Sequence, residues 1–287
     1  MTASAASATT TYLRPRDLAE ALAARAAQPA WMVLAGGTDL MVSARHRPTP
    51  AGILDLWRLP GLGGVSASAD AAWVRIGAGA TWLEVGRDPL VSARLAPLAL
   101  AAREVGALQI QARGTVGGNV GTSSPVGDSL PALLALDAEL ELASARGTRR
   151  LPYRQFCTGY RTTALAADEL IVAVHVPVPA AGVRLGWRKV GTRRAQSISK
   201  IMAAAAITVD GDRVVSARVA LGAVADRPIR VGAVEAAVVG RRVGPGGDAA
   251  DAARAALAGA IRPIDDVRST AAYRLQVAQN VVARFFT

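Results

Sequence analysis

The sequence is poor in the residues that bind metals. Among its 287 residues are one cysteine, Cys157, and two histidines, His46 and His175. A single cysteine forms no internal disulfide, and alone it holds neither an iron–sulfur cluster nor a structural zinc ion. Two histidines also disfavour a centre built on several histidines. Redox chemistry on this chain would therefore have to be carried by a bound organic cofactor.

Packing or exposure explains these three side chains more simply than catalysis does. His46 lies between two arginines, which predicts an exposed position, and His175 lies within an apolar run, which is typical of a structural histidine. Cys157 follows Phe156 and is predicted to be a small core residue rather than a redox thiol. We therefore expect no metal site on this chain and no catalytic side chain among these three.

Lysine is nearly absent from a chain that is strongly basic. Lys189 and Lys200 are the only lysines among 33 Lys and Arg residues, which outnumber 22 Asp and Glu residues and give a net charge of +11. The arginines are scattered, and aromatic residues make up only 4%, too few for a platform that stacks bases. A basic nucleic-acid-binding module is a distant alternative; the charge mainly favours acidic partners, and we expect no nucleic acid.

Long apolar runs are missing as well. The longest candidate, 201–209, is far shorter than the roughly 18 residues that a membrane-spanning helix needs. Residues 1–11 contain no basic segment followed by an apolar one, so they do not resemble a secretory signal. With 51% apolar and 19% charged residues, the sequence predicts a folded, cytoplasmic protein of one or two domains without a membrane span.

The apolar periodicity predicts alternating helices and strands up to about residue 178. Helices are expected at 17–27, from 39 onward, at 95–105 and at 129–136, and strands at 31–35, 53–56, 72–77, 138–142 and 170–176. Thr81 with Glu84 three residues later predicts a capping box at a further helix start. The stretch 114–128 is too rich in Gly, Ser and Thr to predict regular structure.

Pro177 and Pro179 mark the best candidate for a domain boundary, because the pattern changes after them. Strands are expected at 185–190, 201–209 and 214–223, with a hairpin turn at 210–212, followed by helices at 232–239, 248–257 and 265–285. A small sheet followed by helices is an α+β arrangement.

Two glycine-rich segments, 34–40 and 113–128, carry the clearest chemical signal. They read Leu-Ala-Gly-Gly-Thr-Asp-Leu and Arg-Gly-Thr-Val-Gly-Gly-Asn-Val-Gly-Thr-Ser-Ser-Pro-Val-Gly-Asp. Glycine lets the backbone approach a ligand closely, and consecutive N–H groups form a concavity that suits anions. Hydroxyl donors to phosphate oxygens are available from Thr38, Thr115, Thr122, Ser123 and Ser124. Two such segments could hold the two phosphates of a dinucleotide.

The common nucleotide-binding motifs do not match. A Walker loop ends in Gly-Lys-Ser/Thr, and no glycine of this chain precedes a lysine. A Rossmann fingerprint needs a third glycine, and the candidate that begins at Gly77 has Trp82 in that place. Ordinary tight turns therefore remain an alternative reading of the two segments on spacing alone.

Five segments in order resemble the FAD-binding subunit of the molybdenum hydroxylases, the xanthine dehydrogenase and aerobic carbon monoxide dehydrogenase family. They are Ala35–Leu40, Thr115–Asn119, Ser124 to Asp128, Gly159–Thr162 and Arg188–Lys200, the last in the xanthine dehydrogenase style. The resemblance covers nearly the whole chain. It implies an α+β protein with a two-subdomain FAD-binding fold of the vanillyl-alcohol-oxidase (PCMH) type at 1–178, divided at about 60/61, and a C-terminal α+β domain at 179–287.

The resemblance also implies which residues hold FAD. One group would wrap the pyrophosphate and ribityl region: Ala35, Gly36, Gly37, Thr38, Asp39 and Leu40. A second group would supply the other half of the grip, further hydroxyl contacts and a polar edge for a ribose or adenine group: Thr115, Gly117, Gly118, Asn119, Thr122, Ser124 and Asp128. Ile171 and Lys189 fall where the family has further flavin contacts, Lys189 near the isoalloxazine. Asp39 could instead cap the helix that follows it, and Lys189 could be a surface charge.

The function implied by the resemblance is electron transfer. A molybdenum-binding large subunit would oxidise the substrate, a small subunit would hold two [2Fe–2S] clusters, and this chain would pass electrons through FAD to NAD or another acceptor. A dimer of heterotrimers is expected. A stand-alone FAD-dependent oxidoreductase of the same fold remains the alternative, although the sequence offers no obvious base for its own substrate.

Overall fold

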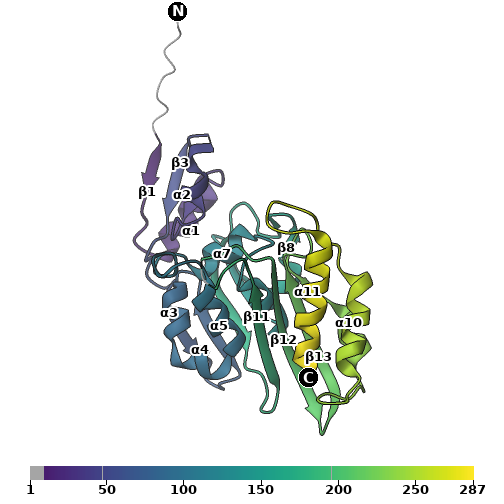
Figure 1. The fold of residues 1–287 in the computed structure, drawn as a ribbon. Helices are drawn as coiled ribbons and strands as arrows, with labels where there is room; N and C mark the ends of the chain where they lie inside the picture. Colours follow the sequence, from purple (N-terminus) through teal and green to yellow (C-terminus); the bar gives the residue numbers. More distant parts are fainter. Residues whose placement is uncertain (1–9, 47, 195) are drawn as a thin grey trace, which may run out of the picture.

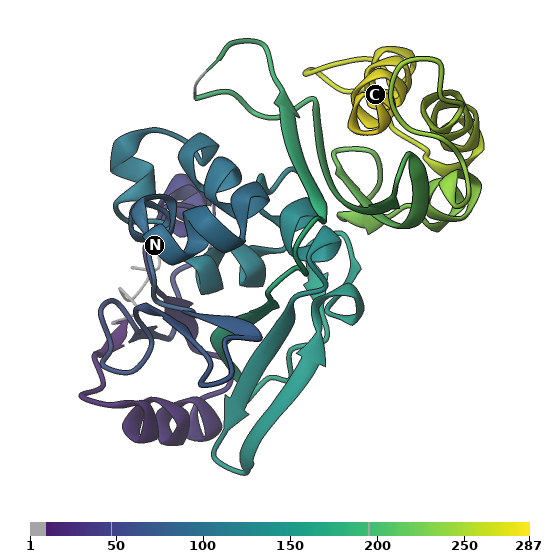
Figure 2. The same cartoon turned by 90° about the horizontal axis from the view of Figure 1, so that it is seen from below.

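The structure is a computed structural model that describes residues 10–46, 48–194 and 196–287. The chain folds into three main β-sheets with helices packed against them (Figure 1). This mixture of helices and largely antiparallel strands confirms the expected α+β class. Figure 2 shows the first sheet (purple) and the C-terminal helices (yellow) at opposite sides of the molecule, with the middle sheet between them.

The first sheet is small and parallel. Its part of the chain comprises β1 (Thr11–Leu13), α1 (Leu18–Ala27), β2 (Met32–Leu34), α2 (Leu40–Ser43), a 3-10 turn (Ala44–His46) and β3 (Gly52–Asp55). The strand order is β1-β3-β2. Helix α1, expected at 17–27, begins where the Asp17 carboxylate accepts a hydrogen bond from the backbone N–H of Glu20. The end of β2, at Leu34, begins the first glycine-rich segment, 34–40.

The second sheet has five antiparallel strands in the order β4-β5-β10-β6-β7. They are β4 (Val65–Ala67), β5 (Trp73–Gly77), β6 (Glu139–Ser144), β7 (Gly147–Pro152) and β10 (Leu170–Pro177). One face contributes Ile76 and Val174 to the largest core. On the other face, Val172 packs with Leu54 of the first sheet. The two sheets therefore meet at one end of β10.

Helices and a short hairpin cover the second sheet. They are α3 (Trp82–Arg87), α4 (Pro89–Arg94), α5 (Ala96–Glu104), α6 (Leu108–Gln111), α7 (Val116–Thr122), α8 (Leu130–Ala135), a 3-10 turn (Tyr153–Gln155), β8 (Cys157–Gly159) and β9 (Thr162–Thr163). The capping box at the start of α3 is confirmed, because the Thr81 hydroxyl accepts from the N–H of Glu84 and the Glu84 carboxylate accepts from the N–H of Thr81.

Helix α7 corrects one expectation from the sequence. The stretch 114–128 was expected to be irregular, yet its first half is a helix whose N-cap, Thr115, accepts a hydrogen bond from the N–H of Gly118. Val116 and Val120 are buried in the core, and Ser123 ends the helix in a left-handed conformation at φ +48°. Tertiary burial of one face thus overrides the poor helix propensity of three glycines.

The C-terminal part is a four-stranded antiparallel sheet with helices on one face. Its elements are β11 (Arg184–Val190), β12 (Ile201–Asp210), β13 (Arg213–Gly222), β14 (Ile229–Arg230), α9 (Gly232–Val238), α10 (Ala249–Ala260), α11 (Ala271–Ala283) and a 3-10 turn (Arg284–Phe286). The predicted hairpin turn is present, with Gly211 at φ +58°. The last helix begins at 271 rather than at 265, because Asp266 and Ser269 form a tight turn before the cap at Thr270.

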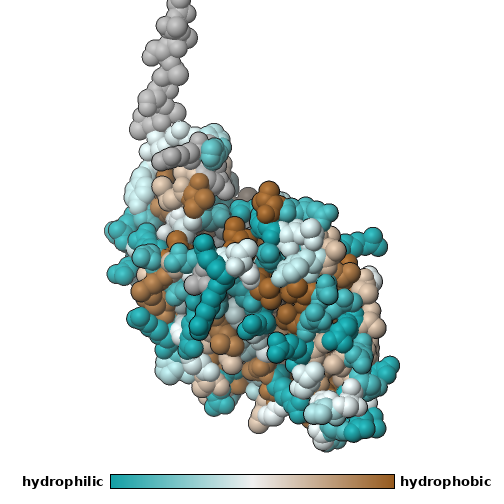
Figure 3. Space-filling view, in the orientation of Figure 1, coloured by the Kyte–Doolittle hydropathy of each residue, from teal (hydrophilic) through white to brown (hydrophobic). Residues whose placement is uncertain are grey.

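The C-terminal sheet packs on both of its faces. One face, including Ala203 and Ala205, joins helices α9 to α11 in a separate core. The other face, including Ala204 and Ala220, packs into the core of the second sheet, and its strands contact α5 and α8. Among the described residues, no helix is long and apolar enough to cross a membrane. The face shown in Figure 3 likewise mixes hydrophilic and hydrophobic residues without a continuous hydrophobic band.

Candidate cofactor-binding site

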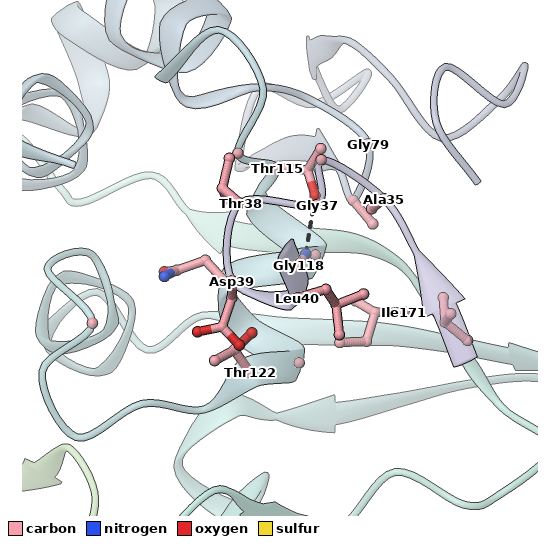
Figure 4. Close-up of a pocket in the computed structure, with 18 of the residues that line it drawn as sticks. Ala35, Gly37, Thr38, Asp39, Leu40, Gly79, Thr115, Gly118, Thr122 and Ile171 are labelled. Carbon is pink, nitrogen blue, oxygen red and sulfur yellow. Dashed lines mark hydrogen bonds between the residues drawn. The ribbon is translucent and has the colours of Figure 1, made fainter. Parts of the chain in front are cut away.

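A cavity of about 630 Å³ lies where the first and second sheets meet. Both glycine-rich segments line it, together with residues of β10 and of the β8–β9 turn (Figure 4). Fourteen of the fifteen predicted site residues are among its lining: Ala35, Gly36, Gly37, Thr38, Asp39, Leu40, Thr115, Gly117, Gly118, Asn119, Thr122, Ser124, Asp128 and Ile171. The volume is within the range of sites that bind a drug-sized ligand or a cofactor.

The glycines of the first segment allow the two segments to lie in direct contact. A Cβ on Gly36 would lie 1.9 Å from the carbonyl oxygen of Arg113, so that position admits no side chain without movement of the backbone. Gly37 has a φ of +76°, a left-handed conformation that glycine adopts without strain. The Arg113 guanidinium in turn lies 3.9 Å from the ring centre of Trp57, which follows β3. These contacts tie the first sheet to the start of α7.

Three consecutive backbone donors line the cavity without an internal acceptor. Within the part of the chain that the structure describes, the N–H groups of Gly36, Gly37 and Thr38 donate to no protein atom. Successive free N–H groups in a turn form a concavity for an anion. The pyrophosphate of a dinucleotide is such an anion, so the donor set of this segment fits FAD.

The second segment offers no such run of free donors at the start of α7. The N–H groups at the start of α7 are used inside the protein: Val116 donates to the carbonyl of Ala80, and Gly117 donates to that of Ala78. Figure 4 shows the third of these bonds, from the N–H of Gly118 to the Thr115 hydroxyl. The structure therefore differs from the expectation that both segments form anion concavities. The second segment shapes the cavity wall instead.

Glycine is needed for different reasons along α7. A Cβ on Gly117 would lie 2.7 Å from that of Ala78, which is tighter than real contacts allow. A Cβ on Gly118 would meet only the Thr115 hydroxyl, at 2.9 Å, and one on Gly121 would meet only Ile171, at 3.5 Å. Gly117 is thus required by the packing of α7 on the second sheet, and Gly118 by its closeness to the Thr115 hydroxyl, whereas Gly121 keeps the cavity open.

Ser123 does not present its hydroxyl to the cavity, contrary to the expectation from the sequence. Thr38, Thr122 and Ser124 line the cavity, as expected. Ser123 is instead fully buried, and its hydroxyl donates to the Sγ of Cys157 at 3.0 Å. Its left-handed backbone at the end of α7 turns it away from the wall. Cys157 is half-buried and packs against the largest core, in agreement with its expected structural role.

Asp128 and Lys189 form a buried ion pair at one end of the cavity. The Lys189 ammonium donates to Asp128 Oδ2 at 2.7 Å, and the Ser199 hydroxyl donates to Oδ1 at 2.6 Å. Burial raises the pKa of the Asp128 carboxyl, and the bonds from Lys189 and Ser199 oppose that shift. Lys189 is not among the lining residues; it reaches the cavity wall through Asp128. It is therefore not an exposed surface charge.

Asp39 meets a residue that the site prediction omitted. It occupies the N-cap position of α2, but its side chain makes no capping hydrogen bond there. Its carboxylate instead lies 3.4 Å from Nη1 of Arg161, which also lines the cavity. Arg161 belongs to one of the segments that carry the family resemblance, so the sequence contained a reason to include it among the site residues. Other lining residues had no signal of their own, among them Gly79, Trp82, Leu165 and Leu170.

The histidines lie outside this site. His46 is exposed, and His175 is buried on the second sheet, where its Nε2 lies 2.6 Å from Glu141 Oε2. This agrees with the structural role expected for His175. Across the described residues, no group of three or more His, Cys, Asp or Glu side chains could hold a metal ion.

Comparison with known proteins gives the family. Residues 6–179 match the FAD binding domain in molybdopterin dehydrogenase, and residues 188–287 match the CO dehydrogenase flavoprotein C-terminal domain. The chain is 34% identical over 221 residues to the putative xanthine dehydrogenase FAD-binding subunit of Escherichia coli, which covers 76% of this chain and 75% of that protein. It is 30% identical to the glyceraldehyde dehydrogenase medium chain of Sulfolobus acidocaldarius, with 96% of each covered.

The fold has a close counterpart among solved structures. A chain of carbon monoxide dehydrogenase from Hydrogenophaga pseudoflava superimposes with a TM-score of 0.90 at 30% identity, over 96% of this chain and 95% of that one. The expected flavin-binding fold with a C-terminal domain is thereby confirmed. The chain belongs to the FAD-binding medium subunits of molybdenum hydroxylases of the xanthine dehydrogenase and carbon monoxide dehydrogenase type, and is an oxidoreductase subunit.

Proposed function

We propose that FAD binds in the cavity between the first and second sheets. The observation that carries this proposal is the set of unpaired N–H groups of Gly36, Gly37 and Thr38 on the cavity wall. They are suited to the pyrophosphate, which is the most charged part of the cofactor. Asp39 and Leu40 continue this segment, and Ala35 precedes it.

The second glycine-rich segment completes the site in this proposal. Thr115, Gly117, Gly118 and Asn119 form the second half of the grip, and Thr122 and Ser124 add hydroxyl groups; all six line the cavity. Ile171 supplies an apolar contact from β10. Asp128 holds a polar edge of the cofactor, and Lys189 acts near the isoalloxazine through its pair with Asp128.

The chain serves as an electron-transfer station between partner subunits. It receives electrons from [2Fe–2S] clusters on a small subunit and passes them to NAD or another acceptor. A large subunit carries the molybdenum cofactor, and the complex is a cytoplasmic dimer of heterotrimers. The names of the similar medium chains support the presence of large and small partner subunits. Bound FAD would supply the electron-carrying chemistry, while the residues of this chain bind it, orient it and tune its potential.

The two parts of the chain have separate tasks in this proposal. Residues 1–178, in subdomains that divide at about residue 60, contribute all of the described residues that line the cavity. Residues 179–287 contribute Lys189 and Ser199, which hold Asp128 from outside the cavity. The C-terminal domain thus contributes to the cofactor site by holding the Asp128 carboxylate in place.

The visible spectrum of the purified chain tests the cofactor. We expect flavin absorbance that survives gel filtration, or that returns when the apoprotein is mixed with FAD. A chain that neither carries nor takes up FAD would refute the proposal. Co-expression with neighbouring genes tests the assembly: molybdenum and iron–sulfur subunits should co-purify, whereas an active FAD enzyme without them would favour the stand-alone alternative.

A further inference from the structure

Arg161 is the one cationic residue among the described residues that line the cavity. The other charged lining residues are the acids Asp39 and Asp128. Asp128 is already neutralised by Lys189 at 2.7 Å. A dinucleotide would bring two further negative charges from its pyrophosphate. Arg161 is therefore the cavity residue available to balance them.

The backbone of Arg161 is unusual for a residue with a side chain. Its φ is +50°, in the turn between β8 and β9, where Gly159 pairs with Thr162. The left-handed region favours glycine, and a residue with a Cβ is strained there. Non-glycine residues in such conformations cluster at ligand-binding sites. The chain thus keeps a long cation at a position where glycine would be easier to accommodate.

The contact with Asp39 keeps Arg161 beside the first glycine-rich segment. Asp39 directly follows Thr38, the last of the three residues with unpaired N–H groups. The Nη1 of Arg161 lies 3.4 Å from Asp39 Oδ2, and the two side chains are 40% and 42% exposed. An ion pair this long and this exposed is weak, so the guanidinium can exchange its partner.

We infer that Arg161 and the N–H groups of Gly36, Gly37 and Thr38 form one subsite for the pyrophosphate of FAD. In this subsite the guanidinium leaves Asp39 and donates to phosphate oxygens, for which its planar fork of donors is well suited. The inference rests on the proposed binding of FAD in this cavity. It adds a recognition residue from the β8–β9 turn, 122 positions from Asp39 in sequence.

Arg161→Gly separates ligand binding from folding. Glycine accepts the left-handed φ, so the apoprotein should melt no lower than the wild type. FAD binding, followed by quenching of flavin fluorescence, should weaken about 10- to 100-fold, the loss expected for a charge-assisted hydrogen bond. Arg161→Lys keeps the charge without the fork and should fall between the two.

Arg58→Gly is the matched control. Arg58 is also an exposed arginine with a left-handed backbone, at φ +57°, and it does not line the cavity. Its replacement removes the same charge and the same strain. FAD affinity should remain at the wild-type value in this variant. An equal loss in both variants would overturn the inference, because it would reflect overall charge alone.

Two fragments of FAD identify the group that Arg161 recognises. ADP contains the pyrophosphate, and riboflavin contains the flavin without phosphate. Arg161→Gly should weaken ADP binding by the same factor as FAD binding and leave riboflavin binding unchanged. Wild-type FAD affinity in this variant, or an equal loss for riboflavin, would overturn the subsite. A wild-type chain that binds no FAD would instead refute the proposed function on which it rests.

Discussion

The Lys189 ammonium donates to the Asp128 carboxylate at 2.7 Å and thereby joins the C-terminal sheet to the wall of the cavity. The two side chains are 6% and 12% exposed, and the same ammonium also donates to the carbonyl of Glu104. A pair this deeply buried is costly to break, because the remaining charge has no solvent to stabilise it. The site and the C-terminal domain are therefore coupled through Asp128.

Removal of either charge should destabilise the protein strongly. We expect Asp128→Asn and Lys189→Met each to lower the free energy of unfolding by roughly 3–5 kcal/mol. The double variant should lose less than the sum, because neither charge is then left alone. Urea denaturation of the apoprotein measures all three values. Strict additivity would show that the two side chains do not interact.

The same pair should shift the reduction potential of bound FAD in opposite directions. A positive charge near the isoalloxazine stabilises the anionic reduced flavin. Lys189→Ala should therefore lower the potential, and Asp128→Asn should raise it. Equilibration with redox dyes measures both shifts. If neither variant changes the potential, Lys189 acts only on stability and does not influence the flavin.

Gly36→Ala should damage both the fold and the site. The new Cβ would lie 1.9 Å from the carbonyl oxygen of Arg113, so the two segments would have to separate. We expect a loss of about 1–3 kcal/mol in the free energy of unfolding, together with much weaker FAD binding. Gly63→Ala is the control, because a Cβ there meets nothing within 4 Å. Unchanged stability in Gly36→Ala would contradict the close approach of the two segments.

Gly118→Val should act in the opposite way, on binding more than on folding. A Cβ at this position would lie 2.9 Å from the Thr115 hydroxyl, a side-chain atom that can rotate away at the cost of its cap on α7, and the residue lines the cavity. The branched side chain would occupy space that the cofactor needs, so FAD binding should be abolished. Circular dichroism should still report the folded state, and the C-terminal domain should remain intact. Full FAD occupancy would place the cofactor away from α7.

The free energy of unfolding should depend on pH through Glu169. Arg149 donates two hydrogen bonds to this carboxylate, at 2.6 and 2.8 Å, and they hold its pKa below the usual value. A lowered pKa in the folded state contributes stability above the unfolded pKa of about 4.3, and this stability is lost as the pH falls through the folded pKa.

Glu169→Gln removes this contribution. We expect a loss of about 1–2 kcal/mol at pH 7, reduced from the buried value because Arg149 is 44% exposed. The difference from the wild type should shrink below about pH 4, where the wild-type carboxylate also becomes protonated. Urea denaturation between pH 3 and 7 measures it. A constant difference over that range would be incompatible with an ionised Glu169.

Local sequence rules predicted the elements whose determinants lie close together in the chain. The capping box of Thr81 and Glu84 is present as predicted, because its donors and acceptors are three residues apart. Helix α7 escaped prediction, because Val116 and Val120 gain their stabilisation from the core of the second sheet. Ser123 was misjudged for the same reason, since its partner Cys157 is distant in sequence.

By itself the sequence determined that the chain is poor in cysteine and histidine, that two glycine-rich segments carry its binding chemistry, and which residues resemble the flavoprotein family. Only the tertiary structure decided that the N–H groups of Gly36, Gly37 and Thr38 find no acceptor among the described residues. The acceptors that occupy the second segment, the carbonyls of Ala78 and Ala80, come from another part of the fold. Charge pairing was decided in the same way, because Arg161 meets Asp39 across 122 positions of sequence. Hydrogen bonds and ion pairs depend on distance in space, which a linear pattern does not contain.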